Sequence, residues 1–292
     1  MANDRTVLPG AWRRVKVVLP RELEDEAVGL VAVAGGDGAQ TTAAGRGRIS
    51  LEAWFDDVDS ARAAQRLLTA LEGAVVEAGE PREIRDPGWL EATLVPRGPL
   101  AAGRFVVLDR SAQLAGLAED AIPIVLPPGR AFGTGEHATT RMCLELIGRH
   151  ARPGRPTLDV GTGSAILAIA AAKLGAAPVF ALDNDPTVLD VALENVNLNG
   201  VGERVTVAAG SWPQVPKGAR YGLVVANIHR TAIVRGARPM ARRLEPGGVA
   251  VLSGFHVEDA PRVLAAWNGA GAREVDRRQD GEWCALAMGM PD

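Results

Sequence analysis

The sequence contains little cysteine and no long uninterrupted apolar run, and both shortages narrow the class of protein. Its only two cysteines, Cys143 and Cys284, lie inside apolar patterns, and their spacing fits neither a metal site nor a disulfide framework. The longest apolar tract, 164–182, is interrupted by a lysine, a glycine and a proline, which does not suit a membrane span. We therefore expect a cytoplasmic protein in a reducing compartment, with no membrane partner.

An excess of positive charge and an abundance of aromatic residues are also missing. The chain has 32 basic and 35 acidic side chains, a net charge of −3, and only 4% aromatic residues. Proteins that bind nucleic acid directly carry a basic face, often with aromatic side chains between the basic ones. The N-terminal segment has neither an apolar core nor a cationic lead, so no secretory signal is visible. We expect no direct contact with nucleic acid.

Residues 1–85 alternate between strand and helix patterns. Strand alternation and helical spacing succeed one another in the segments 12–20, 21–35, 40–44, 48–55, 61–73 and 74–79. The resulting order, β-α-β-β-α-β, is that of a ferredoxin-like domain, and a small module of this kind often recognises a partner. Residues 86–128 are rich in proline and contain only two strand patterns, which indicates a linker with short extended segments.

From residue 156 onward, strands and helices alternate in the manner of an open parallel sheet. The chain ends differently, with two strand patterns joined at Asp280-Gly281, a favoured tight hairpin turn. A parallel sheet finished by an antiparallel hairpin departs from the dinucleotide dehydrogenases. It indicates the methyltransferase version of the doubly wound α/β fold, behind an N-terminal α+β domain.

The stretch LDVGTGSAILAIA, 158–170, is a strand that runs into a glycine turn and then a helix. Gly161 and Gly163 let the backbone pass close to a ligand at the carboxyl end of the strand, next to the positive end of the helix dipole. A dehydrogenase fingerprint needs glycine where Ile166 stands, so a pyrophosphate ligand is disfavoured. The alternative is a glycine-rich turn that binds nothing.

Asp183 ends the next strand, twenty residues beyond Gly163. A carboxylate there can accept hydrogen bonds from both ribose hydroxyls of a nucleoside, whereas Asp185, before Pro186, is better explained as a helix cap. The glycine turn and the strand-end carboxylate together predict a nucleoside-bearing cofactor. Asp159, in the strand before the turn, is assigned to the same cofactor site.

The strand pattern VVANI ends in Asn227, followed by Ile228. The Asn227 side-chain carbonyl and a following backbone carbonyl could hold an amine with its lone pair aimed at a methyl group, so we predict that Asn227 and Ile228 are catalytic and that Asn227 also borders the cofactor. The alternative is that this asparagine only forms a turn.

Five motifs in chain order carry a resemblance to a known family: AFGTGEHATTRMCLELI, LDVGTGSAILAIAAAKLGA, ALDNDPTVLDVALENVNLNGV, VVANI and LEPGGVAVLSG. With them the chain resembles the bacterial ribosomal protein L11 methyltransferases, strongly from residue 129 onward. This resemblance implies a ferredoxin-like recognition domain, a flexible linker, and a class I domain, 129–292, that uses S-adenosyl-L-methionine. It also implies transfer of methyl groups to lysine side-chain or N-terminal amines of a ribosomal protein held by the N-terminal domain.

The resemblance further places Phe132, Gly133, Thr134 and His137 in the cofactor or substrate site. Their loop lacks the glycine-lysine-threonine of a phosphate loop, and His137 has no second ligand nearby to indicate a metal. The alternative is that Thr139 caps the following helix while His137 packs structurally.

The chain departs from the family pattern at two places. Ala165 stands where the family usually has glycine, and His229 and Arg230 stand where it usually has nonbasic and small residues. The two polar side chains would lie at the rim where the amine approaches, unless they turn outward. A different acceptor, in another protein or a small molecule, is therefore the second hypothesis, and a noncatalytic cofactor-binding module is the third.

Overall fold

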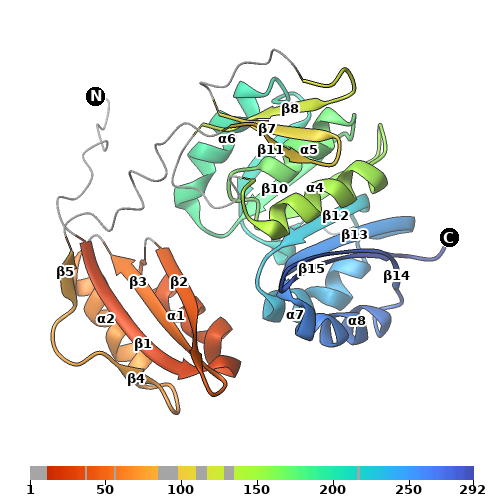
Figure 1. Cartoon of the computed structure of the whole chain (residues 1–292). Helices are drawn as coiled ribbons and strands as arrows, with labels where there is room; N and C mark the ends of the chain where they lie inside the picture. The colour runs from red at the N-terminus through yellow and green to blue at the C-terminus, as the bar shows by residue number, and fades with distance from the viewer. Residues whose placement is uncertain are drawn as a thin grey trace. The chain divides into compact units, whose positions relative to one another are not determined.

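The structure is a computed structural model in which the chain divides into two compact units, Met1–Thr93 and Leu94–Asp292 (Figure 1). The residues that it describes are 12–36, 38–55, 57–84, 98–109, 117–127, 135–215 and 218–292. Three predicted site residues, Phe132, Gly133 and Thr134, lie outside the described residues. Within the described part, no helix is both long enough and apolar enough to cross a membrane.

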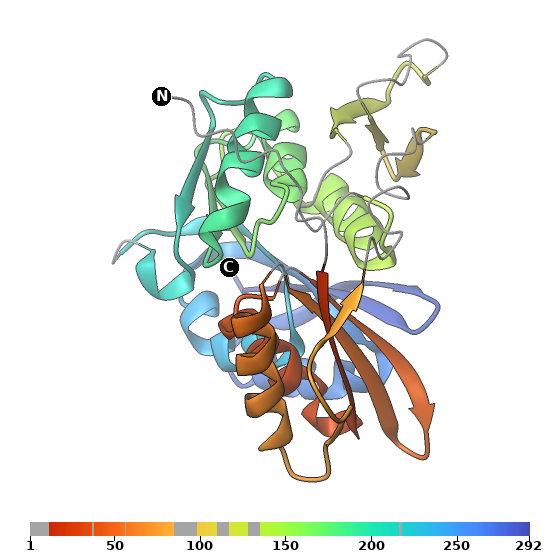
Figure 2. The same ribbon diagram turned by 90° about the vertical axis from the view of Figure 1, so that its left-hand side faces the viewer.

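The first unit is an antiparallel sheet with two helices. Its elements are β1 (Trp12–Pro20), η1 (Arg21–Leu23), α1 (Glu24–Val33), β2 (Gly38–Gly45), β3 (Arg48–Phe55), α2 (Val58–Thr69), β4 (Val75–Val76) and β5 (Arg82–Ile84). The strand order is β2-β3-β1-β4, and β5 also pairs with β1. Alternate residues of β3 are buried, since the face that bears Leu51 and Phe55 packs with the two helices into one core. Figures 1 and 2 show these helices in red and orange beside their sheet.

The second unit is built on a seven-stranded sheet. Its strands are β9 (Thr157–Val160), β10 (Val179–Asp183), β11 (Val205–Ala209), β12 (Tyr221–Asn227), β13 (Leu244–His256), β14 (Arg273–Asp280) and β15 (Trp283–Gly289), in the order β11-β10-β9-β12-β13-β15-β14. The first five in this order are parallel, whereas β15 runs antiparallel to β13 and to β14. This confirms the predicted parallel sheet with a C-terminal antiparallel hairpin.

Helices cover both faces of this sheet (Figure 1). On one face lie α4 (Ala138–His150), α5 (Ile166–Lys173) and α6 (Leu189–Leu198), and on the other lie α7 (Arg230–Ala241) and α8 (Ala260–Asn268). The single-turn helices η2 (Pro186–Val188) and η4 (Val257–Asp259) each join a strand to a helix, and η3 (Trp212–Gln214) lies between β11 and β12. Because both faces are covered, the strands are apolar along their length instead of alternating.

A three-stranded sheet forms a further layer of the second unit. It consists of β6 (Leu100–Ala102), β7 (Phe105–Leu108) and β8 (Ile122–Val125). Phe105 and Ile124 are fully buried in the same core as α4 and α5. The described part of the segment predicted as a linker thus packs into this core. The domain boundaries inferred from the sequence stay a prediction.

Ion pairs tie α4 to the edge strand β14. They are Arg141–Asp280 at 2.6 Å, Glu145–Arg278 at 3.0 Å and Arg149–Asp276 at 3.3 Å. The carboxylates and guanidinium groups are all partly exposed. The pairs run along the length of α4 and add to the packing of its buried face against the sheet.

Candidate active site

The candidate site lies at the carboxyl ends of β9 and β12. These two strands are neighbours, but the chain leaves β9 toward β10 and β11 on one side and continues from β12 toward β13 on the other. Doubly wound sheets bind ligands at such a reversal of strand order, because the connections leaving the two strands diverge there. The glycine turn follows β9, and Asn227 ends β12.

The glycine turn and Asp183 are joined directly. The Gly163 N–H donates to Asp183 Oδ2 at 2.9 Å, and the Asp185 N–H donates to Oδ1 at 3.0 Å. Gly161 and Gly163 both have positive φ, 73° and 51°, which explains why glycine is used there. An ionised carboxylate has about four acceptor positions, so the half-buried Asp183 retains capacity for ligand hydroxyls.

Asp159 lies beneath the turn and not on its surface. It is completely buried, its Oδ2 accepts a hydrogen bond from Thr162 Oγ1 at 2.7 Å, and its Oδ1 has no partner among the described residues. The pKa of Asp159 is raised to about 7, mainly by burial and to a smaller extent by the charge of Asp183, while the Thr162 hydrogen bond and the nearby Ala168 N–H oppose the shift. Its position suits support of the turn better than contact with a ligand.

Asn227 is oriented by the start of α4. Its Nδ2 lies 3.3 Å from Thr139 Oγ1 and 3.5 Å from Thr140 Oγ1, and both threonines are buried. This arrangement directs the amide nitrogen toward the start of α4, and the amide oxygen, on the other branch of the planar amide, points away from these two hydroxyls. The next residue, Ile228, donates its N–H to the Ser253 carbonyl of β13 at 3.1 Å.

His137 caps α4, so the alternative in which Thr139 is the cap is wrong. The His137 Nδ1 accepts from the Thr139 N–H at 3.4 Å and lies 2.7 Å from Thr139 Oγ1. Burial lowers the pKa of His137, and the charges of Arg141 and His256 lower it further. The imidazole is therefore predominantly neutral at pH 7.

Sequence reasoning missed Trp283 and His256, which complete this edge of the site. The Trp283 ring stands edge-on to His137, with centroids 4.7 Å apart, and to His256, with centroids 4.3 Å apart. A signal was present in the sequence: β15 runs opposite to the parallel strands, so its first residue comes to the edge where those strands end.

The departures from the family pattern have structural explanations. Ala165 adopts the left-handed conformation, φ 64° and ψ 15°, which explains why glycine is usual there. Arg230 turns toward Asp259, and the two form an ion pair at 2.5 Å. His229 precedes the first turn of α7 and is exposed.

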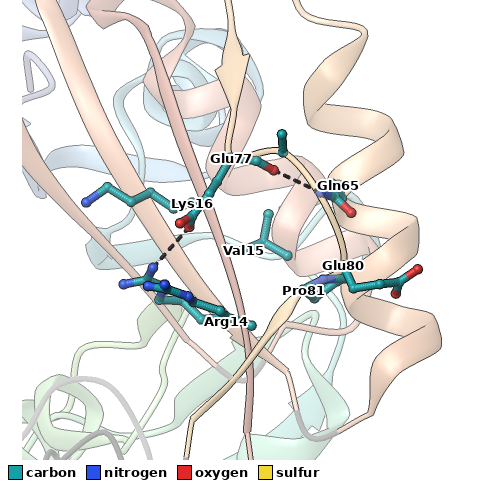
Figure 3. A pocket seen from close by; sticks show the side chains of 9 residues that line it. Arg14, Val15, Lys16, Gln65, Glu77, Glu80 and Pro81 are labelled. Atoms are coloured by element: carbon teal, nitrogen blue, oxygen red, sulfur yellow. Dashed lines mark hydrogen bonds and ion pairs between the residues drawn. The ribbon is translucent and has the colours of Figure 1, made fainter.

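A separate polar cavity of about 210 Å³ occurs in the first unit. Figure 3 shows Arg14 reaching the Glu77 carboxylate, at 3.0 Å, and the Gln65 amide approaching the Glu77 carbonyl oxygen, at 3.1 Å. Lys16 pairs with Glu52 at 2.8 Å. Arg14, Lys16 and Glu77 therefore all take part in ion pairs with neighbouring side chains of the first unit.

Comparison with known proteins identifies the family of this chain. The family model for "Ribosomal protein L11 methyltransferase (PrmA)" matches residues 18–290. The proteins of that name from Pelotomaculum thermopropionicum and Thermus thermophilus are 41% identical over 206 residues and 42% identical over 207. These alignments cover 70% and 71% of this chain and 67% and 79% of the relatives. The crystal structure of the ribosomal protein L11 methylase from Lactobacillus delbrueckii subsp. bulgaricus superposes with a TM-score of 0.62 and 28% identity, covering 67% of this chain and 100% of that one. The chain belongs to the family of ribosomal protein L11 methyltransferases.

Proposed function

We propose that this protein transfers methyl groups from S-adenosylmethionine to amines of ribosomal protein L11, either lysine side chains or the N-terminal amine. Family membership gives the substrate and the reaction. The observation that carries the residue assignment is the meeting of three features at one reversal of strand order: the glycine turn, the strand-end carboxylate Asp183, and Asn227-Ile228.

The residues at this point fit the cofactor that the family implies. The Asp183 carboxylate has acceptor capacity for the ribose hydroxyls, and the backbone of Gly161 and Gly163 can approach a nucleoside closely. Asp159 supports the turn from below. We assign the rim of the cofactor's methionine end to Phe132, Gly133, Thr134, His137 and Asn227. When bound, the cofactor supplies a methyl group on a positively charged sulfur, which a neutral amine can attack in line.

The acceptor amine is held by the Asn227 amide oxygen and the Ile228 carbonyl oxygen. Both atoms accept hydrogen bonds from an N–H, so the nitrogen lone pair is left pointing away from them. The contacts from Thr139 and Thr140 to the Asn227 Nδ2 favour the amide orientation that this role needs. A neutral His137 adds no positive charge near an approaching lysine.

Positioning is sufficient to offset the cost of deprotonating the amine. Removing the proton of a lysine at pH 7 costs about 4.6 kcal/mol, and that of an α-amine about 1.4 kcal/mol. Correct orientation in a water-excluding site contributes roughly 7–11 kcal/mol. The reaction therefore needs no strong dedicated base, and Asn227 and Ile228 act by orientation.

The first unit is proposed to be the ferredoxin-like domain that recognises L11. Its antiparallel order, β2-β3-β1-β4, with α1 and α2 in the crossovers, follows the β-α-β-β-α-β plan. In this proposal residues 1–85 form the recognition domain and 129–292 carry the catalytic site, and 86–128 connect the two with their strands β6–β8 packed in the core of the second unit.

A second candidate function keeps the cofactor but changes the acceptor to another protein or a small molecule. Its motivation was the pair His229 and Arg230. Because Arg230 is paired with Asp259, its charge is largely compensated and does not argue against the L11 amine. The noncatalytic alternative required both side chains to block the amine, and this ion pair weakens it too.

The test combines the purified protein, labelled S-adenosylmethionine and unmodified L11, with the label located by intact-mass and peptide mass spectrometry. We expect methylated lysines or a methylated N-terminus, and loss of the label with Asp183→Ala. The matched control is Asp185→Ala, since Asp185 caps η2 through the Thr187 N–H at 2.9 Å and should be dispensable for transfer. Cofactor binding without transfer to L11 would instead support the second candidate, to be pursued by labelling whole extracts.

A further inference from the structure

Gly254 interrupts the regular course of β13 beside the candidate site. It has φ +96°, in the region that side-chain-bearing residues rarely adopt, and the register between β13 and β15 shifts between Ser253 and Phe255. The strand therefore bulges at this glycine. The bulge adjoins the carboxyl end of β12, since Asn227 pairs with Ser253.

The backbone of Ile228 fills the space that a side chain at Gly254 would occupy. A Cβ atom added at Gly254 would lie 2.4 Å from the Ile228 carbonyl oxygen, 2.9 Å from its carbonyl carbon and 3.0 Å from its nitrogen. All three distances are shorter than or at the limit of real contacts. Because these atoms belong to the backbone, no side-chain rotation can relieve the clash, and the peptide itself would have to move.

Ile228 is also fixed from the opposite neighbour strand. A Cβ at Gly161, in the turn after β9, would lie 2.3 Å from Ile228 Cγ2. The side chain of Ile228 thus occupies the space left by one glycine, and its backbone occupies the space left by another. The Ile228 N–H bond to the Ser253 carbonyl adds a third restraint.

We propose that Gly254 is a positioning residue for methyl transfer: the bare backbone of its bulge sets the place of the Ile228 carbonyl oxygen that orients the acceptor amine. The inference rests on the proposed role of Ile228 in the transfer. A carbonyl displaced by about 1 Å no longer holds the nitrogen in line with the methyl group, and a misplacement of this size can lower a rate about 100-fold.

The test compares Gly254→Ala with Gly271→Ala. Gly271 has φ +98°, almost the same backbone conformation, but the nearest atom to an added Cβ is Met290 Cε at 3.8 Å, an ordinary contact. Both variants carry the same left-handed strain, so their difference reports the contact with Ile228. We expect Gly254→Ala to lower kcat for L11 about 100-fold, and Gly271→Ala to lower it less than threefold.

Two further readouts separate positioning from general damage. Calorimetric affinity for S-adenosylhomocysteine and the KM for the methyl donor should stay within about threefold of wild type in both variants. Ile228→Ala, which removes the side chain above Gly161, should also lower kcat with donor affinity retained. If Gly254→Ala does not fold, the kcat of Ile228→Ala shows whether the position of Ile228 controls methyl transfer.

The outcomes are distinct. If wild-type protein does not methylate L11, the proposed function fails. If it does, and Gly254→Ala and Gly271→Ala have equal kcat, the inference is overturned. Equal losses of kcat and of S-adenosylhomocysteine affinity in Gly254→Ala would also overturn it, since the glycine would then maintain the cofactor site as a whole. An Ile228→Ala variant with wild-type kcat would contradict the clamping of this residue.

Discussion

Replacing Asp159 with asparagine should remove a pH dependence of stability from the second unit. Burial raises the pKa of Asp159 to about 7, compared with 3.8 for an exposed aspartate. Between these values the folded chain holds a proton that the unfolded chain has released. Stability is therefore greatest below the lower value, falls as the pH rises, and levels off above about 7.

The size of the stability change depends on how much of the range between pH 3.8 and about 7 the experiment covers. In an experiment from pH 5 to pH 8, the folded chain keeps the Asp159 proton up to about pH 7, which is about two pH units. Each of these units lowers the unfolding free energy by about 1.36 kcal/mol. We expect the wild-type protein to lose roughly 3 kcal/mol of unfolding free energy from this group. Asparagine does not titrate, and its amide oxygen can still accept the Thr162 hydrogen bond.

The assay is urea unfolding of wild type and Asp159→Asn at both pH values, followed by circular dichroism. The lowered pKa values of His137 and His150 give an opposite slope, with stability rising up to about pH 6.5, but both variants share it. The difference between the two slopes thus isolates Asp159. Equal slopes in the two proteins would refute the reasoning, and carbon-13 titration of the Asp159 carboxyl would then show whether the pKa is ordinary.

Three further predictions concern the site and its support. Asp183→Ala should weaken S-adenosylhomocysteine binding about 10- to 150-fold, the equivalent of roughly 1.5–3 kcal/mol for lost charged hydrogen bonds; calorimetry showing less than a threefold change would contradict the assignment. Arg230→Ala should leave the KM for L11 within about threefold of wild type, because Asp259 already holds the guanidinium; a tenfold change in steady-state kinetics would place Arg230 at the substrate. Arg278→Ala should cost about 1 kcal/mol of unfolding free energy through its pairs with Glu145 and Asp276, less in high salt; urea unfolding with a salt-independent loss would rule out an ionic cause.

The parts of the fold that depend on local periodicity could be predicted from the sequence. The parallel strands are continuous apolar runs, and Asp280-Gly281 marks the hairpin, so the sheet and its antiparallel end were predictable. The layer β6–β8 was not recognised as part of a core, because its strands are short and lie among prolines. Phe105 and Ile124 become core residues only through contact with α4 and α5.

In the candidate site, too, some features could be predicted from the sequence and others could not. The spacing of Gly163 and Asp183 predicts that they lie close together, because one follows β9 and the other ends the neighbouring parallel strand β10, but it does not predict the hydrogen bond between them. Spacing does not reveal that Asp159 is buried beneath the turn, or that Trp283 reaches His137 from the far end of the chain. Those facts depend on tertiary packing.

The ion pairs between α4 and β14 favour one register of the helix along the strand. Four residues of helix rise roughly 6 Å, and two residues of strand about 6.7 Å, so steps of four along α4 keep pace with steps of two along β14. Sliding α4 by one turn would bring Arg141 opposite Arg278 and Glu145 opposite Asp276, like charges in both cases. The alternation of sign therefore disfavours a slip of one turn, and in the observed alignment the start of α4 has His137 beside Trp283.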